Sequence, residues 1–231
     1  MRLDPTRLLR GLGLLAWALF FDYLWLAGKA STYIGPRTTW VVTFGAITLT
    51  LVAVVYLAST VSRRPGTPLT AAEVGRLGVI VAPLILAVMA PAVSLGAQAV
   101  GQKRSADGAT SLARLGDYDG DIRLYELAAA TFDKKWAAER GIEAGLKVEF
   151  DGFVSRRTRN GQVEISRFMA TCCAADAVPY SVQVKPPDGA IDFETNQWVL
   201  VRGTVTADPK RTFVITADKL EAADRPSNPY G

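Results

Sequence analysis

The sequence predicts a membrane protein with three α-helical spans and an exported small β domain, an OB-like five-stranded barrel preceded by one helix. Three observations predict this fold class. Residues 38–62 and 77–102 contain no formal charge over 25 and 26 residues. Charge is also divided unevenly, because residues 1–102 carry 8 Lys/Arg and 3 Asp/Glu whereas residues 103–231 carry 18 and 19. After Gly145 the apolar residues recur with a period of two, as they do in a half-buried strand.

The first hundred residues predict the anchor, residues 1–102. Segments 38–62 and 77–102 each exceed the roughly 20 apolar residues that cross about 30 Å of hydrocarbon. Residues 11–28 form a third apolar run, and because three arginines precede it a cleaved signal peptide is the alternative. We favour an uncleaved helix, since no A-x-A-like cleavage site follows and two further spans do.

Two local patterns predict how the spans pack. The second span has a stripe of small residues at 3-4-3 spacing, which is typical of a helix–helix contact; its members are Thr43, Ala46, Thr50 and Ala53. Pro83 and Pro91 predict a kinked third span whose freed carbonyls are satisfied inside a protein interface. Thr70 and Glu73 before it have the spacing of a capping box.

Asp22 is an acidic residue inside the first span. An acid in a span costs about 2.5–3.5 kcal/mol on insertion scales and marks a functional candidate by default. Alternatively, Asp22 lies within two turns of the outer interface, among aromatic residues, and meets water or lipid headgroups there.

The distribution of Lys and Arg predicts the orientation. An inside N-terminus places six basic residues in the cytoplasm, namely Arg2, Arg7, Arg10, Arg63, Arg64 and Arg76. Four then lie outside near the membrane, namely Lys29, Arg37, Lys103 and Arg104. The positive-inside bias therefore favours a cytoplasmic N-terminus, and three spans export the C-terminal domain. That domain has a net charge of −1, so we expect no nucleic-acid partner.

The exported part begins with a polar tether over residues 103–121. Its DYDGD run at 117–121 does not fit an EF-hand, because the sixth and twelfth positions of that loop are Ile122 and Ala128. Asp121 is expected to cap the next helix instead. One amphipathic helix is predicted over residues 122–140 from apolar residues four apart, namely Leu124, Ala128, Phe132 and Trp136.

The rest of the exported domain, within residues 122–231, predicts five short strands. The alternating segments begin at residue 146 and continue at 162–170, 179–185, 197–205 and 212–220, separated by turn signals. Gly152 and Gly203 interrupt two strands of similar form, VEFDGFV and VLVRGTV, and such glycines mark bends in a small barrel. These features favour an OB-like barrel.

Chemistry is expected at the adjacent pair Cys172 and Cys173, with Asp176 three residues on. Two thiolates and a carboxylate could ligate Zn or Cu(I), although both thiols can join one site only at a bulge or strand end. A buried core cysteine, a vicinal disulfide and a disulfide between chains are the alternatives. The chain has no histidine, which excludes Ser-His and Cys-His catalysis and imidazole metal sites, so no enzyme is predicted.

At these residues the chain resembles the YcgQ-like bacterial membrane proteins, a family of permease subunits. The likeness rests on Tyr33–Arg37 (YIGPR), the paired prolines, Gly152–Val154 and the long string RFMATCCAADA at 167–177. It continues through WVLVRGT at 198–204 and the closing Pro229–Tyr230. The resemblance implies a larger multi-span permease-like partner and a link to metal, particularly zinc.

Two functions remain open from the sequence. The chain is expected to be an accessory subunit of a multi-span permease, in contact with membrane lipid, whose outer domain handles substrate such as a thiophilic metal ion. The alternative is a stand-alone thiol protein at the cell surface that senses redox state or metal through Cys172 and Cys173.

Overall fold

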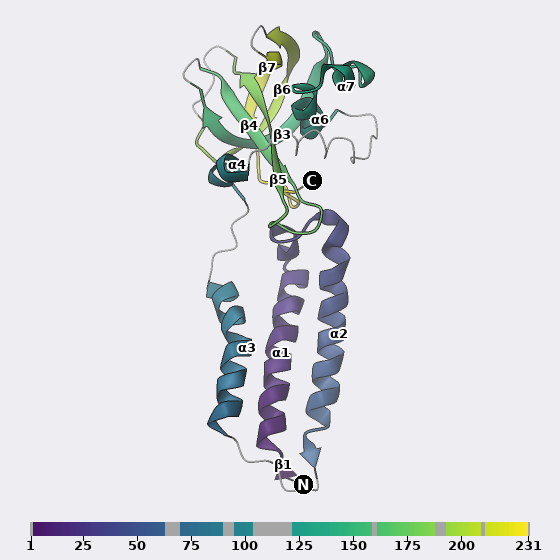
Figure 1. The fold of residues 1–231 in the computed structure, drawn as a ribbon, viewed down its shortest axis with the longest axis vertical. Helices are drawn as coiled ribbons and strands as arrows, with labels where there is room; N and C mark the ends of the chain where they lie inside the picture. The colour runs from purple at the N-terminus through teal and green to yellow at the C-terminus, as the bar shows by residue number, and fades with distance from the viewer. Residues whose placement is uncertain are drawn as a thin grey trace. The chain divides into compact units, whose positions relative to one another are not determined.

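The computed structural model divides the chain into two compact units, Met1–Val93 and Ser94–Gly231 (Figure 1). It describes residues 2–62, 70–89, 95–103, 122–158, 161–187, 193–208 and 211–230. The boundary lies earlier than the sequence predicted at 102. The reason is that residues 95–102, assigned above to the third span, pack against the strands through Val100 and its neighbours. Pro91 and the predicted DYDGD turn at 117–121 lie outside the described residues.

The described residues of the first unit form three α-helices and parts of their connections. The helices are α1 (Pro5–Leu26), α2 (Thr39–Ala58) and α3 (Ala71–Met89). All three are long and apolar enough to cross a membrane, which agrees with the number of spans predicted. Short 3₁₀ turns, η1 (Lys29–Thr32) and η2 (Pro36–Thr38), join α1 to α2, and β1 (Arg2–Leu3) pairs with β2 (Val61–Ser62).

Helices α1 and α2 pack closely because small residues line their contact. Ala46 and Ala53 of the predicted stripe are fully buried. A Cβ atom at Gly11 of α1 would lie 2.5 Å from the Leu57 side chain of α2. The stripe therefore acts as the helix–helix contact that the sequence predicted.

Helix α3 is held by polar contacts more than by burial. None of its 19 residues is buried. The Trp17 indole Nε1 of α1 donates to the carbonyl of Ile80 at 3.2 Å, in the turn before Pro83. Half of the predicted capping box is present, since the Glu73 backbone N–H donates to Thr70 Oγ1 at 3.3 Å. The Glu73 carboxylate instead pairs with Arg10, at 2.9 Å.

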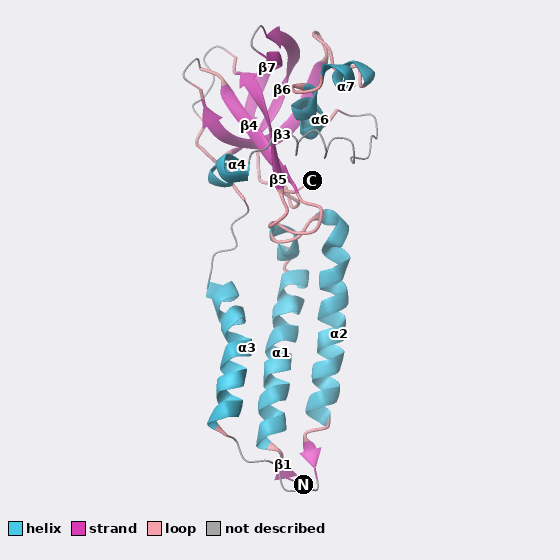
Figure 2. Ribbon diagram, viewed as in Figure 1, coloured by secondary structure: helices cyan, strands magenta, loops and turns pink. Residues whose placement is uncertain are grey.

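The second unit is built on five strands, β3 (Lys147–Arg157), β4 (Val163–Met169), β5 (Val178–Lys185), β6 (Trp198–Asp208) and β7 (Arg211–Ala222). They form one closed sheet in the order β3-β4-β5-β7-β6, with β6 returning to β3 (Figure 2). All neighbours are antiparallel except β5 and β7. The five predicted strands are confirmed.

The predicted single helix over 122–140 is wrong. The chain forms α6 (Leu124–Ala130) and α7 (Lys134–Glu139), and the break leaves Phe132 60% exposed. Asp133 causes the interruption, because its carboxylate accepts from the Trp136 N–H at 3.0 Å and starts a new helix. A third short helix, α4 (Ala97–Lys103), precedes them.

Glycine is required at the two predicted strand positions for different structural reasons. The β6–β7 register shifts between Arg202 and Gly203, so Gly203 lies at a bulge as predicted. Gly152 pairs in regular register with β6, and no shift occurs there. It is needed for close approach, because a Cβ atom would lie 2.7 Å from Ile165 Cγ2 and 3.0 Å from the Ser166 carbonyl.

The described residues of the second unit include two hydrophobic clusters. The larger fills the barrel and includes the buried face of α6, with Leu127, Ile165, Val199 and Ile215 fully buried. The smaller joins α4 to the strand ends and the C-terminus, and it consists of Val100, Phe153, Phe168, Ala170, Ala177, Trp198 and Tyr230. This second cluster positions the candidate site.

Candidate functional site

The cysteine pair lies in the loop between β4 and β5, residues 170–177, which we call the cysteine loop. Both ends of the loop are anchored, because Ala170 and Ala177 are buried in the smaller cluster. Cys172 is exposed and Cys173 is half-buried, and the structure has both as thiols. The buried-core alternative is therefore contradicted for Cys172. The pair does lie beyond a strand end, where the sequence allowed both thiols to join one site.

Asp176 fixes the backbone of the cysteine loop. Its Oδ2 accepts from the Cys172 N–H at 2.8 Å, and its Oδ1 accepts from the Cys173 N–H at 3.2 Å. The Asp176 N–H in turn donates to the Cys173 carbonyl at 3.0 Å. The carboxylate thus satisfies two backbone donors of a tight turn, which is the ordinary use of Asp in turns.

Lys103 at the end of α4 holds the far side of the loop. Its Nζ donates to the carbonyls of Ala174 at 3.0 Å and Ala175 at 2.7 Å. A charge-assisted bond to a carbonyl is stronger than a neutral one. The sequence analysis used Lys103 only to predict the membrane orientation, and no local pattern links this residue to a loop more than 70 residues away.

The two thiols interact with each other. The neighbouring Cys173 is the largest cause that raises the pKa of Cys172 above its ordinary value, followed by desolvation, a hydrogen bond between the side chains and the charge of Asp176. Cys172 is therefore mostly protonated at neutral pH, which makes it a poor nucleophile by itself. A bound cation would reverse this effect, because thiolate ligands form by losing the proton.

The structure brings together two of the three predicted ligand atoms. The described part of the chain contains no group of three His, Cys, Asp or Glu side chains placed to hold a metal ion. The thiols are adjacent, but the Asp176 carboxylate is occupied by the backbone. Metal binding by Cys172, Cys173 and Asp176 therefore stays a prediction, and Asp176 has a positioning role in this structure.

The first two residues of the RFMATCCAADA string, Arg167 and Phe168, stabilise the fold beside the cysteine loop. Arg167 pairs with Asp151 of β3 at 2.5 Å, donates to the Asn228 carbonyl at 3.1 Å, and lies 5.6 Å from the centroid of the Trp198 ring. Phe168 belongs to the smaller hydrophobic cluster. Arg167 therefore ties the C-terminal residues to the strands beside the cysteine loop.

A buried polar network on β3, β4 and β5 escaped the sequence analysis. Glu164 is buried, and its carboxylate accepts from Ser155 Oγ and from Gln183 Nε2, each at 2.9 Å. The hydroxyl of buried Ser166 lies 2.6 Å from Ser155 and 2.7 Å from Ser181. Polar residues at alternating strand positions read as a solvated face, so the sequence carried no signal of their burial.

Asp22 makes an interhelical contact. Its Oδ2 accepts from Thr50 Oγ1 at 3.0 Å, and Thr50 belongs to the small-residue stripe of α2. The alternative given by the sequence analysis was that Asp22 lies near the outer interface and contacts water or lipid headgroups. The structure adds a partner on the neighbouring helix, which is how polar groups in helix bundles are commonly satisfied.

The comparisons with solved structures concern proteins of low identity. Ten1 from Saccharomyces pombe, a telomere capping protein, is 16% identical over 35% of this chain and 69% of that one, with a TM-score of 0.25. The S. pombe Stn1–Ten1 complex is 15% identical over 47% and 79%, at 0.27. Asparaginyl-tRNA synthetase from Pyrococcus horikoshii is 21% identical over 37% and 22%, at 0.25. Scores this low carry no argument about function.

The family comparison is more informative. No curated protein matches the chain. Residues 9–106 match the DUF1980 N-terminal domain, and this matched segment includes α2, α3 and most of α1. Residues 143–231 match the DUF1980 C-terminal domain, which includes all five barrel strands and the cysteine loop. The chain therefore contains both the N-terminal and the C-terminal domain of the DUF1980 proteins.

Proposed function

We propose that this chain is an accessory subunit of a multi-span membrane permease, of the YcgQ-like kind, whose extracytoplasmic OB-like barrel handles a thiophilic metal ion such as Zn(II) or Cu(I). The observation that carries the proposal is the cysteine loop. It presents two adjacent thiols at the surface on a backbone held by Asp176 and Lys103. Soft thiolate ligands select Zn(II) and Cu(I) over hard cations.

A partner in the membrane is supported by α3. Large apolar side chains of this helix are exposed in the isolated chain, among them Val79, Leu86 and Met89. Only a few polar contacts join α3 to α1, including the Trp17 bond to Ile80. A helix attached so lightly has most of its surface available for lipid or for the helices of a larger protein.

The metal proposal is tested on the reduced full-length chain in detergent. Competition with a chromophoric chelator should give a Zn(II) or Cu(I) affinity that Cys172→Ser and Cys173→Ser each reduce at least tenfold. Affinity should also fall at acid pH, because the thiols must lose their protons to bind. Ser155→Ala, which changes a hydroxyl in the buried network away from the loop, is the matched control. An affinity that the cysteine variants leave unchanged would remove the thiols from the site.

The alternative function, a stand-alone surface sensor of redox state or metal, is favoured by the exposure of Cys172. The two functions differ in what accompanies the chain. Mild-detergent extraction after cross-linking in intact membranes should co-purify a multi-span protein if the chain is a permease subunit. Recovery of the chain alone, with metal binding intact, would favour the sensor.

Localisation is tested with the native thiols. In intact cells an impermeant maleimide should modify Cys172, because this residue is exposed and the proposed orientation places it outside. A Cys172→Ser, Cys173→Ser chain with a new cysteine at Arg76 should react only after lysis. The reverse pattern would invert the proposed topology.

A further inference from the structure

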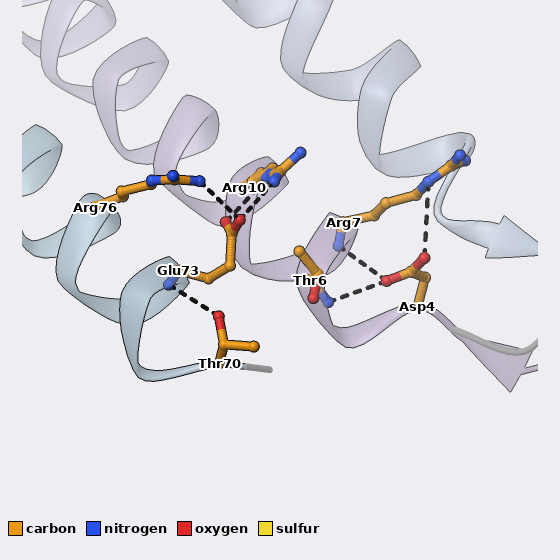
Figure 3. Close-up of polar contacts among 7 residues, drawn as sticks. All are labelled: Asp4, Thr6, Arg7, Arg10, Thr70, Glu73 and Arg76. Carbon is orange, nitrogen blue, oxygen red and sulfur yellow. Dashed lines mark hydrogen bonds and ion pairs between the residues drawn. The ribbon is translucent and has the colours of Figure 1, made fainter. Parts of the chain in front are cut away.

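One end of the helical unit carries a compact charged cluster (Figure 3). Glu73 of α3 accepts from Arg10 of α1, with Oε1 2.9 Å from Nη2 and Oε2 3.4 Å from Nε. Arg76, one turn along α3, lies 3.2 Å from the same carboxylate. Two guanidinium groups thus share one carboxylate, which leaves a net charge of +1 for the cluster.

The exposure of the three side chains shows which charged groups can still contact a ligand. The Glu73 side chain is only 18% exposed, whereas Arg10 is 54% and Arg76 is 73% exposed. The carboxylate is therefore largely covered by its two partners, whereas both arginine side chains are more than half exposed. Arginine has five donors in a planar fork, so one ion pair leaves others for a second anion.

A cavity of about 390 Å³ extends from this cluster between α1 and α3. Arg10, Glu73 and Arg76 line its polar end, and apolar or aromatic residues line the rest, chiefly Gly13, Leu14, Trp17, Tyr56, Leu77 and Ile80. Its volume lies within the range of about 300–1,000 Å³ that is typical of ligand pockets. One turn of an α-helix, about 10 Å across and about 5.4 Å high, already occupies about 400 Å³, so the cavity is too small for a helix of several turns.

We propose that this cavity binds an anionic phospholipid, with the phosphate against Arg10 and Arg76 and an acyl chain along Trp17 and Leu77. The lining matches an amphiphile with one negative charge, because a polar end with a +1 charge continues directly into apolar walls. Basic pockets between helices on the cytoplasmic side bind anionic headgroups. The inference rests on the proposed membrane anchoring and orientation, and it is independent of the cysteine loop.

The test uses the full-length chain purified in mild detergent and native mass spectrometry. Phosphatidylglycerol and phosphatidylcholine with identical acyl chains are added at equal concentration, and the bound fractions are compared. The wild type should prefer phosphatidylglycerol about fivefold, the equivalent of about 1 kcal/mol for one basic residue near anionic lipid. Arg76→Gln should remove the preference, and Arg76→Lys should keep most of it.

Two further variants separate lipid binding from a structural ion pair. Glu73→Gln raises the cluster charge to +2, so the preference for phosphatidylglycerol should increase; a decrease would mean that the three residues only hold the helices together. Arg7→Gln is the matched control, because Arg7 lies 3.8 Å from Asp4 at the same helix end and outside the cavity (Figure 3). Equal losses in Arg7→Gln and Arg76→Gln would reduce the effect to general surface charge and overturn the proposal.

The remaining outcomes are equally decisive. If glycerol phosphate at the same concentration displaces the lipid, the cluster recognises phosphate alone and the acyl contact is wrong. Extraction of the chain from membranes by alkaline carbonate would overturn the proposed anchoring itself. A chain that resists extraction but shows no lipid preference would overturn the lipid site alone.

Discussion

Gly203 offers the sharpest test of the barrel. It lies at the bulge where β6 shifts its register against β7. A Cβ atom at this position would lie 2.4 Å from the Thr216 carbonyl oxygen and 2.9 Å from Ala217 Cα. Both neighbours are backbone atoms of β7, so neither can rotate away. Gly203→Ala must therefore push the two strands apart.

The expected cost follows from these distances. Ordinary contacts of carbon are about 3.5–4.0 Å, so the new atom overlaps its nearest neighbour by about 1 Å. Overpacking a well-packed region typically costs about 1–3 kcal/mol, and a rigid backbone neighbour favours the upper end. We expect Gly203→Ala to destabilise the barrel by about 2–3 kcal/mol, which is a large share of a domain stability of about 5–15 kcal/mol.

Native-state hydrogen exchange of the full-length chain, read by mass spectrometry, can assign this loss to the barrel. Peptides from β6 and β7 should exchange about 30- to 150-fold faster, since about 1.4 kcal/mol corresponds to a factor of ten. Gly101→Ala is the control, because no atom lies within 4 Å of its new Cβ atom in helix α4. It should slow exchange in α4 about two- to fivefold, as expected for glycine replaced by alanine in a helix.

Equal protection of β6 and β7 in Gly203→Ala and in the wild type would refute this reasoning. It would mean that the strands are farther apart than the bulge requires. Faster exchange confined to α1 or α2 would also refute it, because the destabilisation would then lie in the helical unit and not in the barrel.

Three further outcomes are expected. Cys173→Ser should shift the pH dependence of Cys172 alkylation to lower pH, as measured by mass spectrometry. The reason is that Cys173 is the largest cause that raises the Cys172 pKa, and the thiolate is the reactive form. An unchanged pH profile would contradict this. Arg167→Met should cost about 2–4 kcal/mol and release the C-terminal residues to carboxypeptidase, since an ion pair and a carbonyl contact are lost together. Phe132→Ser should change the melting stability by less than about 0.5 kcal/mol, whereas Trp136→Ala should cost about 3–5 kcal/mol, because only Trp136 is buried.

The strands were predictable because their signal is local. The alternation Leu146, Val148, Phe150 places one face inside the barrel, and turn residues separate the segments. The last strand was predicted to begin at residue 212, and in the structure it begins one residue earlier, at Arg211. The strand order could not be read in the same way, since the parallel pair β5–β7 joins segments that are not consecutive.

The helix before the barrel shows where periodicity misleads. Residues four apart were assigned to one face, but Asp133 bonds the backbone of Trp136 and begins a second helix. Asp competes with helix continuation by bonding nearby N–H groups, and this preference is as local as the apolar spacing. The two signals conflicted, and the capping residue decided the outcome.

The location of the candidate site was predictable, but its internal organisation was not. Adjacent thiols could converge only beyond a regular strand, and Cys172 and Cys173 do lie past the end of β4. The contact from Lys103 depends on α4 packing against the barrel, which is a tertiary event. Sequence spacing contains no information about such long-range contacts.

Asp176 changes what the cysteine loop can do. Its carboxylate is committed to the N–H groups of Cys172 and Cys173, so this loop offers a cation two thiolates and no third side chain. A structural zinc site needs four ligands, and a site with two must complete its shell from water or from another protein. Incomplete ligation weakens binding and leaves positions open to an incoming ligand, which suits the transfer of an ion better than its storage. The same geometry would let a permease partner take the ion directly from the two thiolates, and this is why the proposed metal role and the proposed partner belong to one mechanism.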